Sequence, residues 1–302
     1  MGLDNNYIRF DWAIKRLLRD KANFGVLEGF LCVLIGEKFH IVELLESEGN
    51  QTDKEDKFNR VDIKAKNDRD EIIIIEIQLT RELYYLERIL YGVAKAITEH
   101  IHLGNIYSEV KKIYSISILY FDLGKGSDYL YHGQNSFTGV HTGDKLLVNT
   151  KEKDMIVSKM PEEIFPEYYL IRVNEFNQVA RTPLEEWIAY LKDGVIQSET
   201  ETPGLTEARE KLKYYEMSPS ERHAYDEHVN AIMIQNDVLS TSRLEGLIEG
   251  KAEGLIEGKA EGLIEGEINA LRKVALSMKT QGINIASIMA CTGLDTETIA
   301  SL

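Results

Sequence analysis

Four consecutive isoleucines, Ile72 to Ile75, constrain the fold of this chain more than any other feature. A β-branched run of this kind favours a buried strand, and the polar residues 67–71 before it indicate a tight loop. The segment from Phe58 to Leu79 therefore predicts two strands around a polar turn. The second strand nevertheless ends in charged and polar residues, and that end needs a chemical explanation.

The turn predicts which residues of the two strands face each other. If the loop is centred on Arg69, Asp62 lies directly opposite Glu76, and Lys64 shares the same face. Directly opposed residues have Cβ atoms roughly 4.5–5.5 Å apart, so two carboxylates there repel each other. A cation such as Mg²⁺, which prefers carboxylate oxygens and water, would relieve the repulsion. The alternative is a charge cluster without metal, balanced by Lys64 or Arg60.

Charge and hydropathy narrow the class of protein. The formal net charge of −15 over 302 residues counts against binding nucleic acid through overall charge. It leaves room for a local basic groove, and basic residues do cluster around Asp62: Lys54, Lys57, Arg60, Lys64 and Lys66. No apolar run approaches the ~20 residues of a membrane span, and the N-terminus lacks the apolar core of a signal peptide. We therefore expect a cytoplasmic protein without a membrane partner.

The remaining pattern predicts an α/β protein. Residues 7–48 are predicted to be helical, and residues 81–101 have apolar side chains at the spacing of a helix that packs on the sheet. Strands are predicted at 114–123 and 167–173, followed by a helix that Pro183 opens and Gly194 closes. This order of elements is typical of an α/β core rather than a repeat array.

The C-terminal third is organised differently. Residues 196–242 are predicted to be a linker and a charged helical segment, residues 243–268 an acidic repeat, and residues 269–302 a small helical tail. The tail has the outline of a helix-turn-helix with a cap at Asp295, which serves either DNA binding or packing.

The repeat has a period of eight and glycine at every fourth position. Such glycines cost a helix about 1 kcal/mol each relative to alanine. The repeat is either a semi-flexible acidic connector or a self-associating helix that makes a homo-oligomer.

The hairpin also carries a family resemblance. An aspartate, a loop and an aliphatic strand ending in Glu-Xaa-Gln, followed by an arginine-containing helix, resemble the PD-(D/E)XK nuclease superfamily. More narrowly, the matching segments are similar to the recombination-promoting nuclease and transposase family; they read FDWAIKRLL, VDIKAKND, IEIQ and ERILYGVAKAI. The resemblance implies a restriction-endonuclease-like core, a mixed central sheet flanked by helices, as a nuclease-like domain over residues 1–195. A mostly helical, glycine-repeat extension follows it.

The resemblance also implies a site. Asp62 and Glu76 would be ligands of Mg²⁺, with Mn²⁺ as a substitute, and the backbone carbonyl of Ile77 would be a third ligand. Arg88 would match an arginine of the following helix. Glu28, an acid among apolar neighbours in the second predicted helix, points outward or supports the site.

Gln78 would occupy the position usually held by a lysine. It can orient a water by hydrogen bonds but carries no charge, and Lys64 could place an ammonium group nearby. The implied function is a metal-dependent endonuclease that hydrolyses DNA phosphodiester bonds in recombination or mobile-element activity. The alternative is a catalytically inactive nuclease fold that serves as a binding or assembly module and oligomerises through its repeat.

Overall fold

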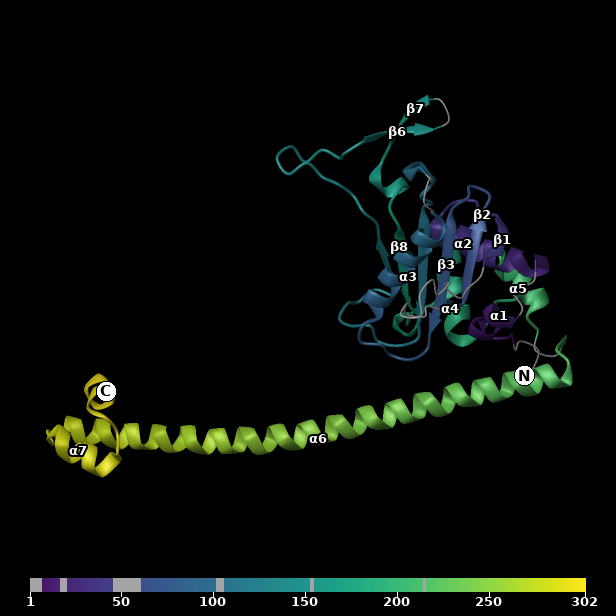
Figure 1. Cartoon of the computed structure of the whole chain (residues 1–302). Helices are drawn as coiled ribbons and strands as arrows, with labels where there is room; N and C mark the ends of the chain where they lie inside the picture. Colours follow the sequence, from purple (N-terminus) through teal and green to yellow (C-terminus); the bar gives the residue numbers. More distant parts are fainter. Residues whose placement is uncertain (1–6, 17–20, 46–60, 102–105, 153–154, 214–215) are drawn as a thin grey trace, which may run out of the picture. The chain divides into compact units, whose positions relative to one another are not determined.

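The structure is a computed structural model, and it describes residues 7–16, 21–45, 61–101, 106–152, 155–213 and 216–302 (Figure 1). The chain forms two compact units, Met1–His228 and Val229–Leu302. Three of the basic residues expected near Asp62 lie outside the described residues: Lys54, Lys57 and Arg60.

The first unit is built on a six-stranded mixed sheet. In spatial order its strands are β1 (Ile41–Leu45), β2 (Ile63–Asn67), β3 (Ile72–Gln78), β4 (Ile113–Leu119), β8 (Glu167–Arg172) and β5 (Leu130–Gly133). β3, β4 and β8 are parallel, and the other neighbouring pairs are antiparallel. β6 (Val148–Glu152) and β7 (Met155–Lys159) form a separate two-stranded sheet. The mixed central sheet confirms the predicted fold class.

The hairpin of β2 and β3 has the register expected from the sequence. Ile63 pairs with Ile75, so Asp62, directly before β2, lies opposite Glu76. The side chain of Asn67 organises the turn, because its Oδ1 accepts hydrogen bonds from the backbone N–H groups two and four residues further on, at 3.1 and 2.8 Å. A locally determined turn therefore sets the register of the strands.

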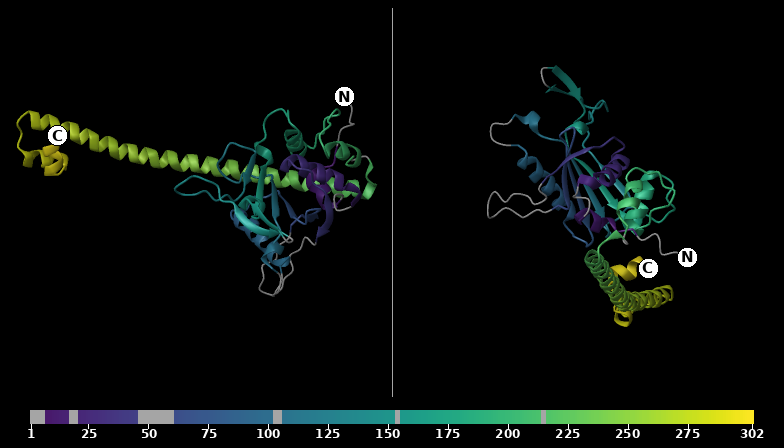
Figure 2. Two further views of the ribbon diagram at one scale, coloured as in Figure 1. Left: turned by 90° about the horizontal axis from the view of Figure 1, so that it is seen from above. Right: turned by 90° about the vertical axis from the view of Figure 1, so that its right-hand side faces the viewer.

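Helices cover both faces of this sheet (Figure 2). They are α1 (Phe10–Arg16), α2 (Phe24–Ile35), α3 (Tyr85–Glu99), α4 (Pro183–Asp193) and α5 (Leu205–Lys211), with short 3₁₀ helices η1 (Lys21–Asn23), η2 (Tyr107–Glu109), η3 (Pro161–Glu163) and η4 (Val173–Glu175). Ile73 and Ile75 face the main core, which α1, α2, α4 and α5 complete. Ile72 and Ile74 face the other way and pack against α3. Because side chains alternate along a strand, Glu76 lies on the α3 face.

β1 corrects the prediction that residues 7–48 are helical. It is an edge strand that pairs antiparallel with β2, and its register is irregular between Ile41 and Glu43. Its sequence, IVELL, is too short to distinguish a strand from a helix by periodicity. The pairing with β2, which is remote in sequence, decides its conformation.

The polar segment after residue 195 returns to the core of the first unit. Leu205, Ala208 and Leu212 are buried there. α5 approaches α2 so closely that a Cβ on Gly29 would lie 2.2 Å from the backbone nitrogen of Gly204. This contact requires glycine, and the first compact unit continues to His228.

A single helix of 62 residues, α6 (Pro219–Thr280), begins at the break predicted before Pro219 and contains the whole period-eight repeat. Leucine and isoleucine side chains of the repeat are exposed. A Cβ added to any glycine from Gly246 to Gly266 would meet nothing within 4 Å, so no contact within the structure requires these glycines.

The second unit ends in the two short helices expected of the tail, α7 (Ile285–Thr292) and α8 (Thr296–Ser301). They pack with the end of α6 around Ala275, Ile288 and Ile299. Asp295 caps α8, as predicted, because its Oδ1 accepts a hydrogen bond from the backbone N–H of Thr298 at 2.7 Å. In the described parts of the chain, no helix is both long and apolar enough to cross a membrane.

Candidate active site

The two carboxylates singled out by the sequence lie together on the α3 face. Glu76 is buried in β3, with 6% of its surface exposed. Asp62 lies opposite, and its Oδ2 accepts a hydrogen bond from the backbone N–H of Ile77 at 2.7 Å. The N–H and C=O of one residue in an antiparallel pair point toward the same neighbouring strand. Because the Ile77 N–H points toward Asp62, the Ile77 carbonyl lies on the Asp62 side of β3 as well.

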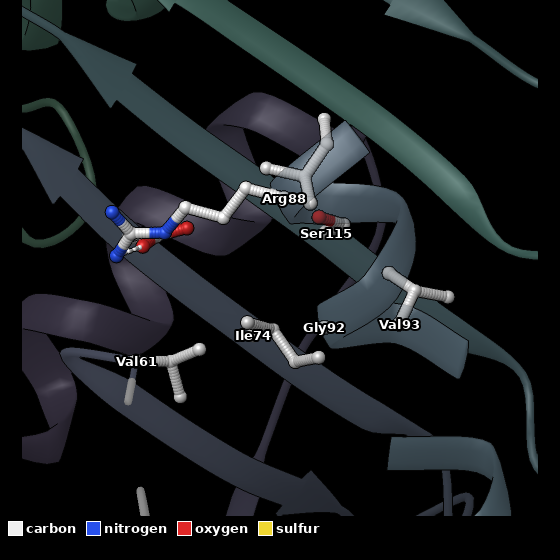
Figure 3. A pocket seen from close by; sticks show the side chains of 8 residues that line it. Val61, Ile74, Arg88, Gly92, Val93 and Ser115 are labelled. Carbon is white, nitrogen blue, oxygen red and sulfur yellow. Dashed lines mark hydrogen bonds and ion pairs between the residues drawn. The ribbon is translucent and has the colours of Figure 1, made fainter. Parts of the chain in front are cut away.

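The environment of Glu76 is electrostatically strained. Burial raises the pKa of the Glu76 carboxyl above its ordinary value of 4.5, and the nearby carboxylates of Asp62 and Glu82 raise it further, while Arg88 opposes them. Nη2 of Arg88 donates a hydrogen bond to Oε1 of Glu76. Figure 3 shows Arg88 extended along the sheet to make this ion pair. The site therefore attracts positive charge.

A third carboxylate, that of Glu82, connects Arg88 to Gln78. Oε1 of Glu82 accepts hydrogen bonds from Arg88 Nη1 at 2.6 Å and from Gln78 Nε2 at 3.0 Å. Gln78 Nε2 also donates to the backbone carbonyl of Thr80 at 3.1 Å. Glu76, Arg88, Glu82 and Gln78 thus form one continuous chain of hydrogen bonds.

Two other residues of the predicted site make different contacts. Lys64 shares the face of Asp62, but its Nζ lies 2.5 Å from Oε2 of Glu99, in the last turn of α3. Glu28 is on α2, which packs on the opposite face, and its Oε1 accepts a hydrogen bond from the backbone N–H of Ile41 at 2.7 Å. The structure therefore brings Arg88 to the carboxylate pair and does not bring Glu28 there.

Several neighbours of Glu76 were not among the predicted site residues. Ser115 and Ser117 of β4 are buried, and Ser117 is the parallel partner of Glu76. The Tyr85 phenol lies close enough to Glu76 to interact with its charge, and burial raises the pKa of this phenol. Small hydroxyls at alternate positions in YSISILY, within an otherwise apolar strand, are the sequence signal that could have revealed this polar face.

A small pocket opens beside this cluster, between the sheet and α3 (Figure 3). It is lined by Val61, Ile74, Glu76, Arg88, Ile89, Gly92, Val93 and Ser115. Its walls are mainly apolar, so a charge held there is poorly screened by water.

The donor set suits a hard cation with few protein ligands. Within the described residues, no three or more His, Cys, Asp or Glu side chains are grouped so that they could hold a metal. Asp62 and Glu76 supply two carboxylates, and the Ile77 carbonyl supplies a neutral oxygen. Mg²⁺ is usually held by one or two protein carboxylates and keeps several waters. These residues therefore fit Mg²⁺ or Mn²⁺ better than a metal that needs a full set of side-chain ligands.

The chain is similar to one known family of proteins. A family model described as PD-(D/E)XK nuclease family transposase matches residues 8–242, which include the sheet, all helices of the first unit and the start of α6. No curated protein and no solved structure matches the chain significantly. The match covers well over half of the sequence, and the chain therefore belongs to the PD-(D/E)XK nuclease family transposases.

Proposed function

We propose that this protein is a metal-dependent endonuclease that hydrolyses DNA phosphodiester bonds in recombination or mobile-element activity. Family membership supports a nuclease of mobile elements that acts on DNA. Metal dependence is supported by the pairing of Asp62 with Glu76 on one face of the hairpin, where the Ile77 backbone also contacts Asp62.

Each residue of the cluster has a role in this proposal. Asp62, Glu76 and the Ile77 carbonyl would hold Mg²⁺ or Mn²⁺, and a bound cation would activate water and stabilise charge on the phosphate oxygens. Gln78 orients the attacking water through a hydrogen bond. Arg88 contributes a fixed positive charge beside the scissile phosphate.

Electrostatics make the cation important for substrate binding as well. The chain has a net charge of −15, and several lysines near the hairpin already have acidic partners. Lys111 pairs with Asp70, and Lys112 lies 2.7 Å from Glu167. Because these lysines are partly neutralised, we expect DNA affinity to depend strongly on the divalent ion.

The test is nicking of supercoiled DNA by the full chain with Mg²⁺ or Mn²⁺, and with EDTA as the metal-free control. Asp62→Asn and Glu76→Gln should abolish nicking while circular dichroism shows that both proteins are folded. Glu87→Gln, which removes an exposed charge from the same helix α3, is the matched control and should cleave at the wild-type rate. Undiminished nicking by the folded Asp62 or Glu76 variant would refute the proposal.

A second function is favoured by two observations. Gln78 lacks the charge of the lysine usual at its position, and α6 exposes leucine and isoleucine side chains along its repeat. They support a catalytically inactive nuclease fold that binds or assembles through a homo-oligomer. Three results together would favour this function. Calorimetry would detect no Mn²⁺ binding, the protein would not nick DNA, and truncation at Ser242 would lower the oligomeric mass.

A further inference from the structure

We infer that Glu82 is the positioning residue of this site, and that it fixes the amide of Gln78 so that the Gln78 carbonyl oxygen is presented to the attacking water. The inference rests on the proposed nuclease function and extends it to a residue outside the metal-binding hairpin. Glu82 lies in the connection between β3 and α3, four residues after Gln78 and six before Arg88.

The orientation of the Gln78 amide follows from the chemistry of its partners. The Thr80 backbone carbonyl and an ionised Glu82 carboxylate can only accept hydrogen bonds. The amide must therefore turn its NH₂ group to both, as the distances of 3.1 and 3.0 Å from Nε2 show. The carbonyl oxygen is left as the other end of the amide, and no hydrogen bond to it is seen in the described part of the chain.

This orientation defines what Gln78 does in place of a lysine. A lysine ammonium donates hydrogen bonds and supplies charge, whereas a fixed amide oxygen accepts a hydrogen bond from water. Gln78 thus orients the water by accepting, and positive charge comes from a different residue. Arg88 supplies it, because its Nη1 is bound at 2.6 Å to the same Glu82 oxygen that holds Gln78.

The Glu82 carboxylate therefore orients both the Gln78 amide and the Arg88 guanidinium. If Glu82 served only the start of α3, its charge would act on the helix dipole, and its removal would affect stability. The N-cap residue of this helix, Tyr84, makes no side-chain capping hydrogen bond. A positioning role instead predicts a loss in turnover, since the metal ligands and the DNA-binding surface are unchanged.

The experiment compares Glu82→Ala with wild type in steady-state nicking by the full chain with Mn²⁺. We expect kcat to fall about 10- to 100-fold, as is typical when a partner that orients a site residue is removed. KM and the Mn²⁺ affinity measured by calorimetry should stay within about twofold of wild type. Glu82→Gln, which keeps an acceptor oxygen, should recover part of the lost kcat, and Glu87→Ala, on the exposed side of α3, should have no effect.

A double-mutant cycle separates positioning from general damage. In a Gln78→Ala background, Glu82→Ala should lower kcat by a smaller factor than in wild type, because its target is already gone. The same factor in both backgrounds, or a change in KM alone, overturns the positioning role. If Asp62→Asn and Glu76→Gln are inactive while Glu82→Ala cleaves normally, only this inference fails. If the Asp62 and Glu76 variants cleave normally, the nuclease proposal itself fails.

Discussion

Arg88 of α3 donates a hydrogen bond from Nη2 to Oε1 of Glu76, the buried carboxylate of β3. The two residues are twelve positions apart and belong to different layers of the fold. Their contact places a cation on a carboxylate that also faces Asp62. The ion pair thus partly offsets the repulsion between Asp62 and Glu76, for which the sequence suggested a metal.

Metal binding is predicted to stabilise the protein through the carboxylate pair. At an ion concentration 100 times Kd, a ligand that binds only the folded state contributes about 2.7 kcal/mol. For a domain of this size the gain corresponds to a Tm increase of roughly 5–10 °C. Differential scanning calorimetry with Mn²⁺ should show this shift for wild type and lose it in Asp62→Asn and Glu76→Gln. An equal shift in either variant would place the ion elsewhere.

Removal of the Arg88 guanidinium is predicted to raise the affinity for metal but lower the rate of nicking. In Arg88→Ala, a cation no longer competes with Arg88 for Glu76, so Mn²⁺ should bind more tightly at pH 8. The metal-free protein should lose about 1–3 kcal/mol of stability, because a hydrogen bond between charged groups is removed. Nicking should slow. Calorimetry and urea unfolding measure the first two effects, and weaker Mn²⁺ binding would contradict the competition.

Nicking is predicted to require a polar side chain at position 78, and not merely a side chain of the same volume. Gln78→Met keeps the volume and removes the hydrogen bonds, so it should lower the nicking rate by about 10- to 100-fold. Gln78→Lys places an ammonium opposite Glu82, so the protein should fold and cleave faster than the Met variant. Equal rates for Met and Lys would show that position 78 does not take part in the reaction.

The stability of the first unit is predicted to fall in acid through Asp11. This buried residue accepts hydrogen bonds from Arg9 Nε at 3.0 Å and from His228 Nε2 at 2.8 Å. Burial alone would raise its pKa, but the bonds and charges of His228 and Arg9 outweigh it and lower the pKa below 3.8. A lowered pKa contributes stability that is present above the ordinary value and lost as pH falls through the folded value.

Asp11→Asn should therefore lower the free energy of unfolding by about 1–3 kcal/mol at pH 7. In this variant, the free energy of unfolding, measured with urea at several pH values, should also fall less steeply as the pH is lowered. Glu87→Gln, at an exposed position of the same unit, should keep the wild-type profile. An unchanged acid limb in the Asn variant would argue against the role of Asp11.

Alanine in the repeat is predicted to strengthen α6. An added Cβ meets nothing at Gly250, Gly254 or Gly258, and each replacement should favour the helix by about 1 kcal/mol. Far-ultraviolet circular dichroism of the triple variant should show more helix. If copies of the chain pack through the glycines, sedimentation should also show weaker self-association. Unchanged helicity would contradict the expectation that these glycines limit the helix.

Local signals in the sequence were enough to predict several elements. The turn at Asn67 and the isoleucine run gave the register of β2 and β3, and the structure confirms it. Pro183 and Gly194 bound α4 as expected, because a proline in the first turn and a left-handed glycine after the last act within one helical turn. The family motif in the hairpin pointed to the nuclease family that the comparison shows.

By itself, then, the sequence determined the hairpin, its facing carboxylates and the family. Only the tertiary structure decided which helix covers the carboxylates. It placed α3 over Glu76 and α2 on the opposite face, so that Arg88 and Glu82 join the site and Glu28 does not. Local periodicity shows which side of a helix is apolar, but not which face of the sheet that side covers. That choice depends on packing between segments remote in sequence, as with Gly29 of α2 against Gly204 before α5.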